Sequence, residues 1–336
     1  MIRIITILTF MITCFTQVEP LGVKDGRIRG ITMVAPPRAF NDDPMVPIKN
    51  VNADWIAVVP YAYSRKANPE VRFNSKRQWW GERTEGIKES IKAAHNKGLK
   101  VMIKPQVYVP GSWVGDVDYE SEVDWRIWED SYRRYLMTYV DIAIEVGAEM
   151  LCIGTEYKIA VQKRETFWRQ LIQDIRSKYS GLLIYSSNWD GFKNVPFWDD
   201  LDFIGISAYF PLLKDKTPSV KKLRRRWRPI VSKLKKYSKK QGKRIVFTEY
   251  GYLTVDGCAY KSWELEKQVN QLSINQQAQA NAYDALLTTF WNQDFWAGGF
   301  LWKWFPNGMG HEGYPEKDYT PQGKIAEEII KGWYGN

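Results

Sequence analysis

Met150-Leu-Cys-Ile-Gly-Thr-Glu156-Tyr is a short apolar run that ends in a glutamate, and Arg244-Ile-Val-Phe-Thr-Glu249-Tyr-Gly-Tyr252 has the same form. Both runs have the length and composition of buried strands. A carboxylate is costly to bury unless it is paired or used. Two strands that each end in a carboxylate are typical of a barrel whose strand ends carry the chemistry.

Strand-like and helical patterns alternate along the rest of the chain. The eight strand-like runs are residues 28–35, 55–60, 99–105, 150–155, 182–187, 203–207, 245–248 and 298–302. The clearest helical patterns are residues 82–97, 125–146, 166–178, 219–240, 265–292 and 324–331. This alternation predicts an α/β fold, a single (β/α)8 TIM barrel that forms one catalytic domain over residues 25–336. A doubly wound open sheet is the alternative, but the glycine-rich loop that usually follows one of its early strands is missing from the sequence.

The N-terminal residues have the pattern of a secretory signal. Arg3 precedes a short apolar stretch that gives way to polar sequence, and the stretch is too short to span a membrane comfortably. We therefore expect residues 1–20 to be a signal peptide and the protein to be secreted, periplasmic or at the cell surface. Cys14 offers a lipid attachment site, so membrane anchoring through a lipidated N-terminus is an alternative to free secretion.

The net charge of +10 is concentrated in one segment, residues 214–244. This segment has 15 Lys or Arg and one acidic residue, which makes +14 and leaves the rest of the chain at −4. Leu223, Trp227, Leu234 and Tyr237 follow helical spacing, which predicts an amphipathic helix with a basic outer face. A solvated face is the ordinary interpretation, and binding to anionic lipid is an alternative. We expect no nucleic-acid partner, because a secreted protein meets little nucleic acid.

Polar and aromatic residues follow seven of the eight predicted strands. In chain order these residues are Tyr61, Lys104, Glu156, Asn188, Tyr209, Glu249, Trp302 and Trp304. The active site of a barrel of this kind is built at the C-terminal ends of its strands. The chain has 16 Trp and 19 Tyr, whose rings either fill a large core or line a cleft that binds sugars.

The two glutamates suit the cleavage of glycosidic bonds. Retaining glycosidases use one carboxyl group as the acid and base and a second, about 5–5.5 Å away, as the nucleophile. We predict that Glu156 is the acid and base, that Glu249 is the nucleophile, and that Tyr209 orients Glu249 through a hydrogen bond. Two salt-bridged carboxylates at the barrel mouth are the structural alternative. The two histidines, His95 and His311, have no carboxylate spacing that indicates a metal site, and we expect no metal or other cofactor.

The chain resembles glycoside hydrolase family 113 from Gly30 to Trp333. The resemblance lies in Gly154-Thr-Glu156-Tyr, in Phe247-Thr-Glu249-Tyr-Gly-Tyr, and in Phe290-Trp with Gly298-Gly-Phe-Leu-Trp302-Lys-Trp304; Gly205-Ile-Ser-Ala-Tyr209-Phe-Pro and Ser187-Asn188-Trp189 add support. It implies a clan A retaining β-mannanase that hydrolyses β-1,4-mannosidic bonds without a metal. It also implies the same roles for Glu156, Glu249 and Tyr209, and makes Trp302 the platform under the reacting sugar.

The chain departs from most members of the clan at Thr155, where they have an asparagine that binds the 2-hydroxyl of the reacting sugar. A threonine at this position is typical of family 113. The 2-hydroxyl then needs another partner, and Asn188 and Lys104 are our candidates. For Lys104, a salt bridge at the strand end is the alternative. Trp304 and Tyr61 are further candidates for substrate contact.

The sequence leaves several functional alternatives open. We expect endo-acting cleavage of mannan or mannooligosaccharides by a monomer. An exo-acting β-mannosidase, another clan A β-glycosidase, a non-catalytic carbohydrate-binding protein and an anion-binding surface protein are the alternatives. Loops at residues 106–122 and 256–264 would decide whether the cleft is open or closed.

Overall fold

The structure, a computed structural model, describes residues 26–65, 68–308 and 316–336. The expected signal at residues 1–20, with Cys14, and the loop residue His311 lie outside the described residues. Within the described ranges, no helix is both long and apolar enough to cross a membrane.

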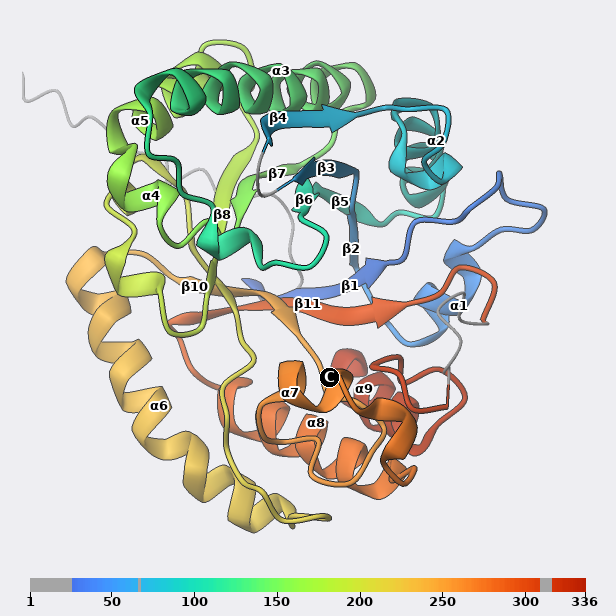
Figure 1. The fold of residues 1–336 in the computed structure, drawn as a ribbon. Helices are drawn as coiled ribbons and strands as arrows, with labels where there is room; N and C mark the ends of the chain where they lie inside the picture. Colours follow the sequence, from blue (N-terminus) through green and yellow to red (C-terminus); the bar gives the residue numbers. More distant parts are fainter. Residues whose placement is uncertain (1–25, 66–67, 309–315) are drawn as a thin grey trace, which may run out of the picture.

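Eight parallel strands close into a barrel, with helices packed around the outside (Figure 1). In chain order the strands are β1 (Ile28–Met33), β2 (Trp55–Val58), β5 (Lys100–Ile103), β7 (Met150–Thr155), β8 (Leu182–Asn188), β9 (Ile204–Ser207), β10 (Ile245–Tyr250) and β11 (Trp296–Trp304). Around the barrel their order is β1-β11-β10-β9-β8-β7-β5-β2, and β1 pairs with β2 to close it. The predicted TIM barrel is confirmed, and each of the eight predicted runs overlaps a barrel strand.

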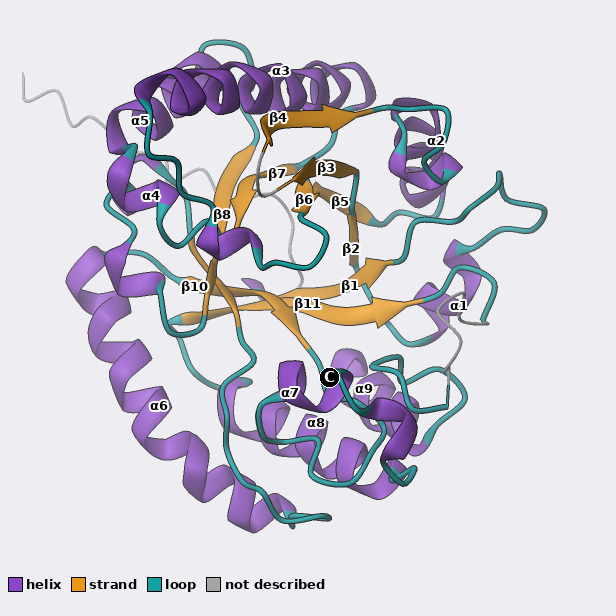
Figure 2. Ribbon diagram, in the orientation of Figure 1, coloured by secondary structure: helices purple, strands orange, loops and turns teal. Residues whose placement is uncertain are grey.

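The helices cover the barrel as Figure 2 shows. They are α1 (Met45–Asn50), α2 (Thr84–Asn96), α3 (Glu122–Val146), α4 (Ala160–Lys163), α5 (Glu165–Arg176), α6 (Val220–Gln241), α7 (Ser262–Glu266), α8 (Gln276–Phe290) and α9 (Ile325–Gly335). Local sequence sets their ends. In α3, for example, the Ser121 hydroxyl accepts from Asp124 N at 3.0 Å, and Gly147 ends the helix in a left-handed conformation.

One predicted helix, residues 265–292, is wrong over its first third. The chain leaves α7 after Glu266, makes a short turn at Val269–Gln271, and begins α8 at Gln276. The reason is a competing cap, because the Asn275 side chain accepts from Ala278 N at 2.9 Å and starts a new helix there. Ile274, just before this cap, forms an isolated bridge with Val255.

The apolar residues form two cores. The smaller one fills the barrel and includes Trp55, Cys152 and Phe300, whereas the larger one lies between the barrel and its helices. Trp128, Trp168 and Trp227 are among the largest fully buried side chains, so many of the tryptophans serve packing rather than sugar binding. Cys152 and Cys258 are both buried and unpaired.

Helix α6 has the predicted amphipathic form. Leu223, Trp227 and Leu234 are buried, and its lysines and arginines are exposed to solvent. Lys222 pairs with Asp215 at 2.9 Å, and α6 itself contains no acidic residue. Whether this face binds an anionic partner stays a prediction.

A second sheet of three strands lies beyond the barrel and was not predicted. It consists of β3 (Tyr61–Arg65), β4 (Asn68–Phe73) and β6 (Gln106–Tyr108) in the order β4-β3-β6. Strand β3 follows β2 after Pro60, and β6 follows β5 after Pro105. A proline cannot donate to a sheet ladder, so each strand breaks at its proline and resumes in the outer sheet. This sheet stands at the C-terminal ends of the barrel strands.

Candidate active site

Glu249 lies near the end of β10 and is held by three side-chain donors. Lys104 Nζ forms a short ion pair with Glu249 Oε1, and Gln106 Nε2 donates to the same oxygen at 2.7 Å. The Tyr209 hydroxyl donates to Oε2 at 3.0 Å. Only 7% of Glu249 is exposed to solvent. Its two oxygens are therefore held by Lys104 just after β5, by Gln106 on β6 and by Tyr209 just after β9.

Lys104 follows β5 and is completely buried. Two buried charges of opposite sign are tolerated when they are paired and hydrogen-bonded, and each charge here offsets the burial of the other. The alternative interpretation of Lys104, a salt bridge at a strand end, is therefore what the structure shows. Its ammonium also lies 5.6 Å from the centre of the Trp302 ring.

Tyr209 follows β9 and makes the expected hydrogen bond to Glu249. Burial, reinforced by the neighbouring charge of Glu249, raises the pKa of Tyr209 well above its usual value. The phenol therefore stays protonated and remains a donor.

Glu156 follows β7 and has a different environment. Trp113 Nε1 donates to Glu156 Oε2 at 2.8 Å, and the side chain is partly exposed. The backbone of Glu156 is left-handed, with φ 57°, and its N–H donates to Ser186 O at 2.7 Å. A left-handed conformation is costly for a residue other than glycine, and such strain is concentrated at functional sites. It directs the chain sharply away from the strand at this point.

Burial, reinforced by the nearby charge of Glu249, raises the pKa of Glu156 to about 7. Hydrogen bonds from Trp113 and Ser207 and the charge of Lys104 oppose this shift. A carboxyl group with a pKa near 7 can both give and take a proton at neutral pH. The pair thus combines one carboxylate that is firmly held with one that can exchange a proton.

Three residues that contact the carboxylates were not among the predicted site residues, namely Gln106, Trp113 and Ser207. Gln106 stands two residues after Lys104, so its place at a strand end was a usable signal. Trp113 lies in the loop before the turn Val114–Asp116, 43 residues before Glu156. No pattern in the sequence links a loop tryptophan to a glutamate at that separation.

Trp302 and Trp304 lie in different environments. Trp302 is partly exposed and lines a cavity, whereas Trp304 is 1% exposed and belongs to the core. Regular alternation along a strand would place both on one face. The pairing of β11 with β1 skips one residue, because Thr32 pairs with Trp302 and Met33 with Trp304. The expectation that Trp304 contacts substrate is therefore wrong.

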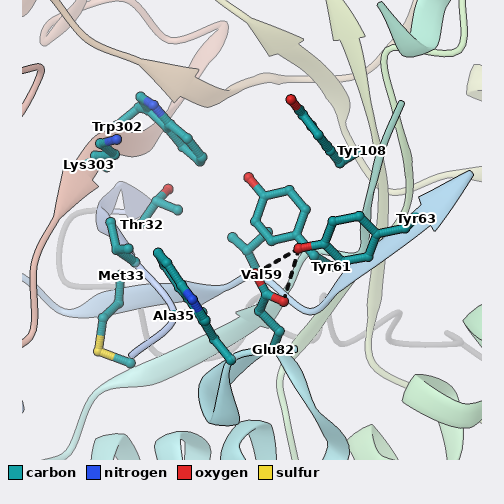
Figure 3. Close-up of a pocket in the computed structure, with 12 residues that line it drawn as sticks. Thr32, Met33, Ala35, Val59, Tyr61, Tyr63, Glu82, Tyr108, Trp302 and Lys303 are labelled. Atoms are coloured by element: carbon teal, nitrogen blue, oxygen red, sulfur yellow. Dashed lines mark hydrogen bonds between the residues drawn. The ribbon is translucent and has the colours of Figure 1, made fainter. Parts of the chain in front are cut away.

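The cavity beside Trp302 has a volume of about 520 Å³, within the usual range for ligand sites (Figure 3). It lies at the ends of β1, β2 and β11, and residues of the outer sheet form part of its wall. Its lining includes five aromatic residues and one acid, namely Tyr61, Tyr63, Trp79, Tyr108, Trp302 and Glu82. Tyr61 is thus placed where a substrate contact was expected.

Asn188 ends β8 on the side of Glu156, and both residues line a small hollow there. The Asn188 amide is engaged locally, because Oδ1 accepts from Trp189 N at 2.9 Å and Nδ2 donates to Asp190 at 3.1 Å. Asn188 lies near the proton-exchanging carboxyl and away from the cavity beside Trp302. Among the described residues, no three His, Cys, Asp or Glu side chains are grouped to hold a metal ion.

Comparison with known proteins gives consistent results. The model of Glycoside Hydrolase Family 113 matches residues 39–324. The β-mannanase AaManA of Alicyclobacillus acidocaldarius, solved in complex with ManMIm, superposes with a TM-score of 0.80 at 25% identity; the match covers 92% of this chain and 97% of that one. A second family 113 β-1,4-mannanase superposes with a TM-score of 0.76 at 27% identity, covering 92% and 99%.

A more distant structural match shares only the fold. The β-glucuronidase of Ruminococcus gnavus has a TM-score of 0.63 at 12% identity, and the match covers 92% of this chain and 50% of that one. No curated protein sequence matches the chain.

Proposed function

The chain belongs to glycoside hydrolase family 113, and from that premise we propose that it hydrolyses β-1,4-mannosidic bonds with retention and cuts within the mannan chain. The observation that carries the proposal is the pair Glu156 and Glu249, which stand in contrasting environments at the ends of two barrel strands. Contrasting environments separate the roles of two carboxyl groups of the same kind.

Glu156 is the acid and base of the proposed mechanism. With a pKa of about 7 it carries a proton in a large fraction of molecules at neutral pH, and the protonated form can donate to the leaving oxygen. The same group, once deprotonated, activates the water that releases the product. Its partial exposure supports this second role, because water must reach it.

Glu249 is the proposed nucleophile. It attacks the anomeric carbon and forms a covalent glycosyl-enzyme, which water then hydrolyses. The donors Lys104, Gln106 and Tyr209 aim its oxygens and restrict its motion. A nucleophile held in this way needs little reorientation to reach an attacking geometry.

The substrate class is inferred from the relatives. The solved family 113 proteins are a β-mannanase and a β-1,4-mannanase, which supports β-mannan or mannooligosaccharides as the substrate here. Trp302, beside the ion pair of Lys104 and Glu249, is the proposed platform for the reacting sugar. The cavity continues from Trp302 toward β1 and β2 and leaves room for further sugars. This room supports cleavage within a chain rather than release of single mannose units from its end.

The proposal is tested by product analysis. Wild-type protein is incubated with β-1,4-mannohexaose, with cellohexaose as the control, and the products are separated by chromatography. Short mannooligosaccharides support endo-cleavage, whereas mannose alone would replace it with exo-cleavage. An early β-anomer in the proton NMR spectrum supports retention, and an early α-anomer would overturn it. No product from mannohexaose would overturn the substrate assignment.

We also propose that the enzyme acts outside the cytoplasm, on the strength of the signal-like residues 1–20 and of a polymeric substrate. Mass spectrometry of the mature protein from its host tests this proposal. Loss of the signal residues supports it, and an acylated Cys14 would identify the mature form as a lipoprotein. An intact N-terminus would contradict it.

A further inference from the structure

Glu82 is a buried acid that faces the cavity and takes no part in the proposed chemistry. It ends the short turn Trp80–Glu82 before α2 and is only 6% exposed. Figure 3 shows its carboxyl group below Tyr63, on the cavity wall away from Trp302. The Tyr63 hydroxyl donates to its two oxygens at 3.4 and 3.3 Å, and Gln78 Nε2 donates at 3.3 Å.

Two other shielded acids of this protein show the usual arrangement, in which a cation is the partner. Glu129 accepts from Arg164 Nε at 2.6 Å, and Asp318 pairs with Lys303 at 3.4 Å. In the described part of the chain, no cation pairs with Glu82. Its side-chain donors are neutral and lie beyond the usual hydrogen-bond distance, and burial raises its pKa. A carboxylate can accept about four hydrogen bonds, so Glu82 has acceptor capacity left for a ligand.

The backbone that carries Glu82 is fixed. Gly81 N donates to Pro36 O at 2.8 Å, and the Tyr139 hydroxyl donates to Glu82 O at 3.2 Å. A Cβ at Gly81 would lie 2.2 Å from the Pro36 ring, so the turn packs tightly against the segment after β1. The carboxyl group is therefore positioned before any ligand binds, as a recognition site requires.

The cavity lies on the side of the site away from Glu156, the proposed proton donor. Glu156 and Asn188 stand at the ends of β7 and β8, whereas the cavity is at the ends of β1, β2 and β11. The leaving group departs toward the acid. Sugars in the cavity are therefore those on the glycone side of the bond that is cut.

We infer that Glu82 binds free hydroxyl groups of a sugar on the glycone side and makes the enzyme selective for mannan that is unsubstituted at that sugar. The inference rests on the proposed function. A carboxylate only accepts hydrogen bonds, and a free hydroxyl donates one. An acetyl ester or a glycosyl branch removes that donor and leaves the buried acceptor unpaired, and sites built for a hydroxyl discriminate strongly against its absence.

The first test compares two aryl substrates with the same leaving group, a β-mannoside and a β-mannobioside. Both substrates place the reacting sugar beside Trp302, but only the second places a further sugar in the part of the cavity toward β1 and β2. Glu82→Gln keeps the shape of the side chain but replaces an acceptor by a donor. We expect it to lower the ratio of kcat/KM for the mannobioside to kcat/KM for the mannoside about tenfold or more. Glu85→Gln is the matched control, because this exposed glutamate lies three residues away and outside the cavity. An unchanged ratio in Glu82→Gln would overturn the inference.

The second test uses acetylated mannan and the same mannan after deacetylation. The wild type should prefer the deacetylated polymer, and Glu82→Gln should narrow that preference, because its amide can donate to an ester carbonyl. Tyr63→Phe removes a donor to the carboxylate at a residue that is 37% exposed. It should shift the kcat/KM ratio and the preference for deacetylated mannan in the same directions as Glu82→Gln, by smaller factors. It also keeps the test valid if Glu82→Gln does not fold. If the preference for deacetylated over acetylated mannan is equal in all three proteins, the inference is contradicted. A wild type that is inactive on mannohexaose would instead contradict the proposed function itself.

Discussion

The end of β10 and the end of β7 deliver the same side chain into different surroundings. Glu249 is held by a lysine, a glutamine and a tyrosine and is almost fully buried. Glu156 has one side-chain donor within 2.8 Å, a left-handed backbone and partial exposure. Their strands have similar apolar sequences, so the difference comes from neighbouring strands and loops. Reactivity at this barrel mouth is thus set by what surrounds each carboxyl group.

Removal of Glu249 should have the largest effect. We expect Glu249→Ala to lower turnover of mannohexaose by at least about a thousandfold, because no covalent intermediate can form. Azide should restore turnover of an activated aryl mannoside and give a product of inverted configuration. Steady-state kinetics and NMR measure both effects. Retention of more than about a tenth of the activity would refute the nucleophile assignment.

Removal of Glu156 should have an effect that depends on the leaving group. Glu156→Ala should slow mannohexaose cleavage by about 10²- to 10⁴-fold, because a sugar leaving group needs a proton. An aryl mannoside with an acidic phenol needs little protonation and should be affected far less in its first step. Burst kinetics with a series of aryl leaving groups measures this difference. Equal losses across the series would count against the acid role.

Removal of Lys104 tests how the surroundings of Glu249 stabilise its buried charge. Lys104→Met should destabilise the fold by about 3–5 kcal/mol, because it leaves Glu249 buried without its counter-charge. Adding Glu249→Gln removes that charge and should recover much of the loss. Urea unfolding of the two single variants and the double variant completes the cycle. Additive losses would mean that the two groups do not stabilise each other.

Removal of the Trp113 hydrogen bond to Glu156 should have the smallest effect. The Trp113 hydrogen bond lowers the pKa of Glu156, so Trp113→Phe should raise it. The acid must be protonated, so activity falls as the pH rises through about 7, and this limb should move to higher pH in the variant. The pH profile of kcat/KM measures the pH at which activity falls in the wild type and in the variant. A limb that stays in place or moves to lower pH would exclude this role of Trp113.

The sequence was sufficient for the barrel and for the residues at its strand ends. Apolar runs mark parallel strands, and parallel strands in a barrel bring their C-terminal ends together. Glu156, Tyr209 and Glu249 could be placed near one another on this ground alone. The prediction failed where regular alternation fails, as at Trp304, where the pairing of β11 skips a residue.

Contacts from loops and turns could not be predicted. Trp113 reaches Glu156 from a loop, and the start of the predicted helix at residue 82 gave no sign that Glu82 faces a cavity. The outer sheet was also missed, because strands β3 and β6 follow prolines that read as strand ends. Such contacts depend on how segments distant in sequence pack, and a local sequence pattern does not predict that packing.

The outer sheet separates the residues that line the cavity from the two carboxyl groups that we propose for catalysis. Tyr61, Tyr63 and Tyr108 come from β3 and β6, whereas both carboxylates that we propose to be catalytic stand at the ends of barrel strands. Directed evolution can therefore randomise these three positions in a combinatorial library while the reaction chemistry is left intact. Screening such a library on decorated plant and yeast polysaccharides would turn one scaffold into a set of enzymes with graded tolerance for side groups.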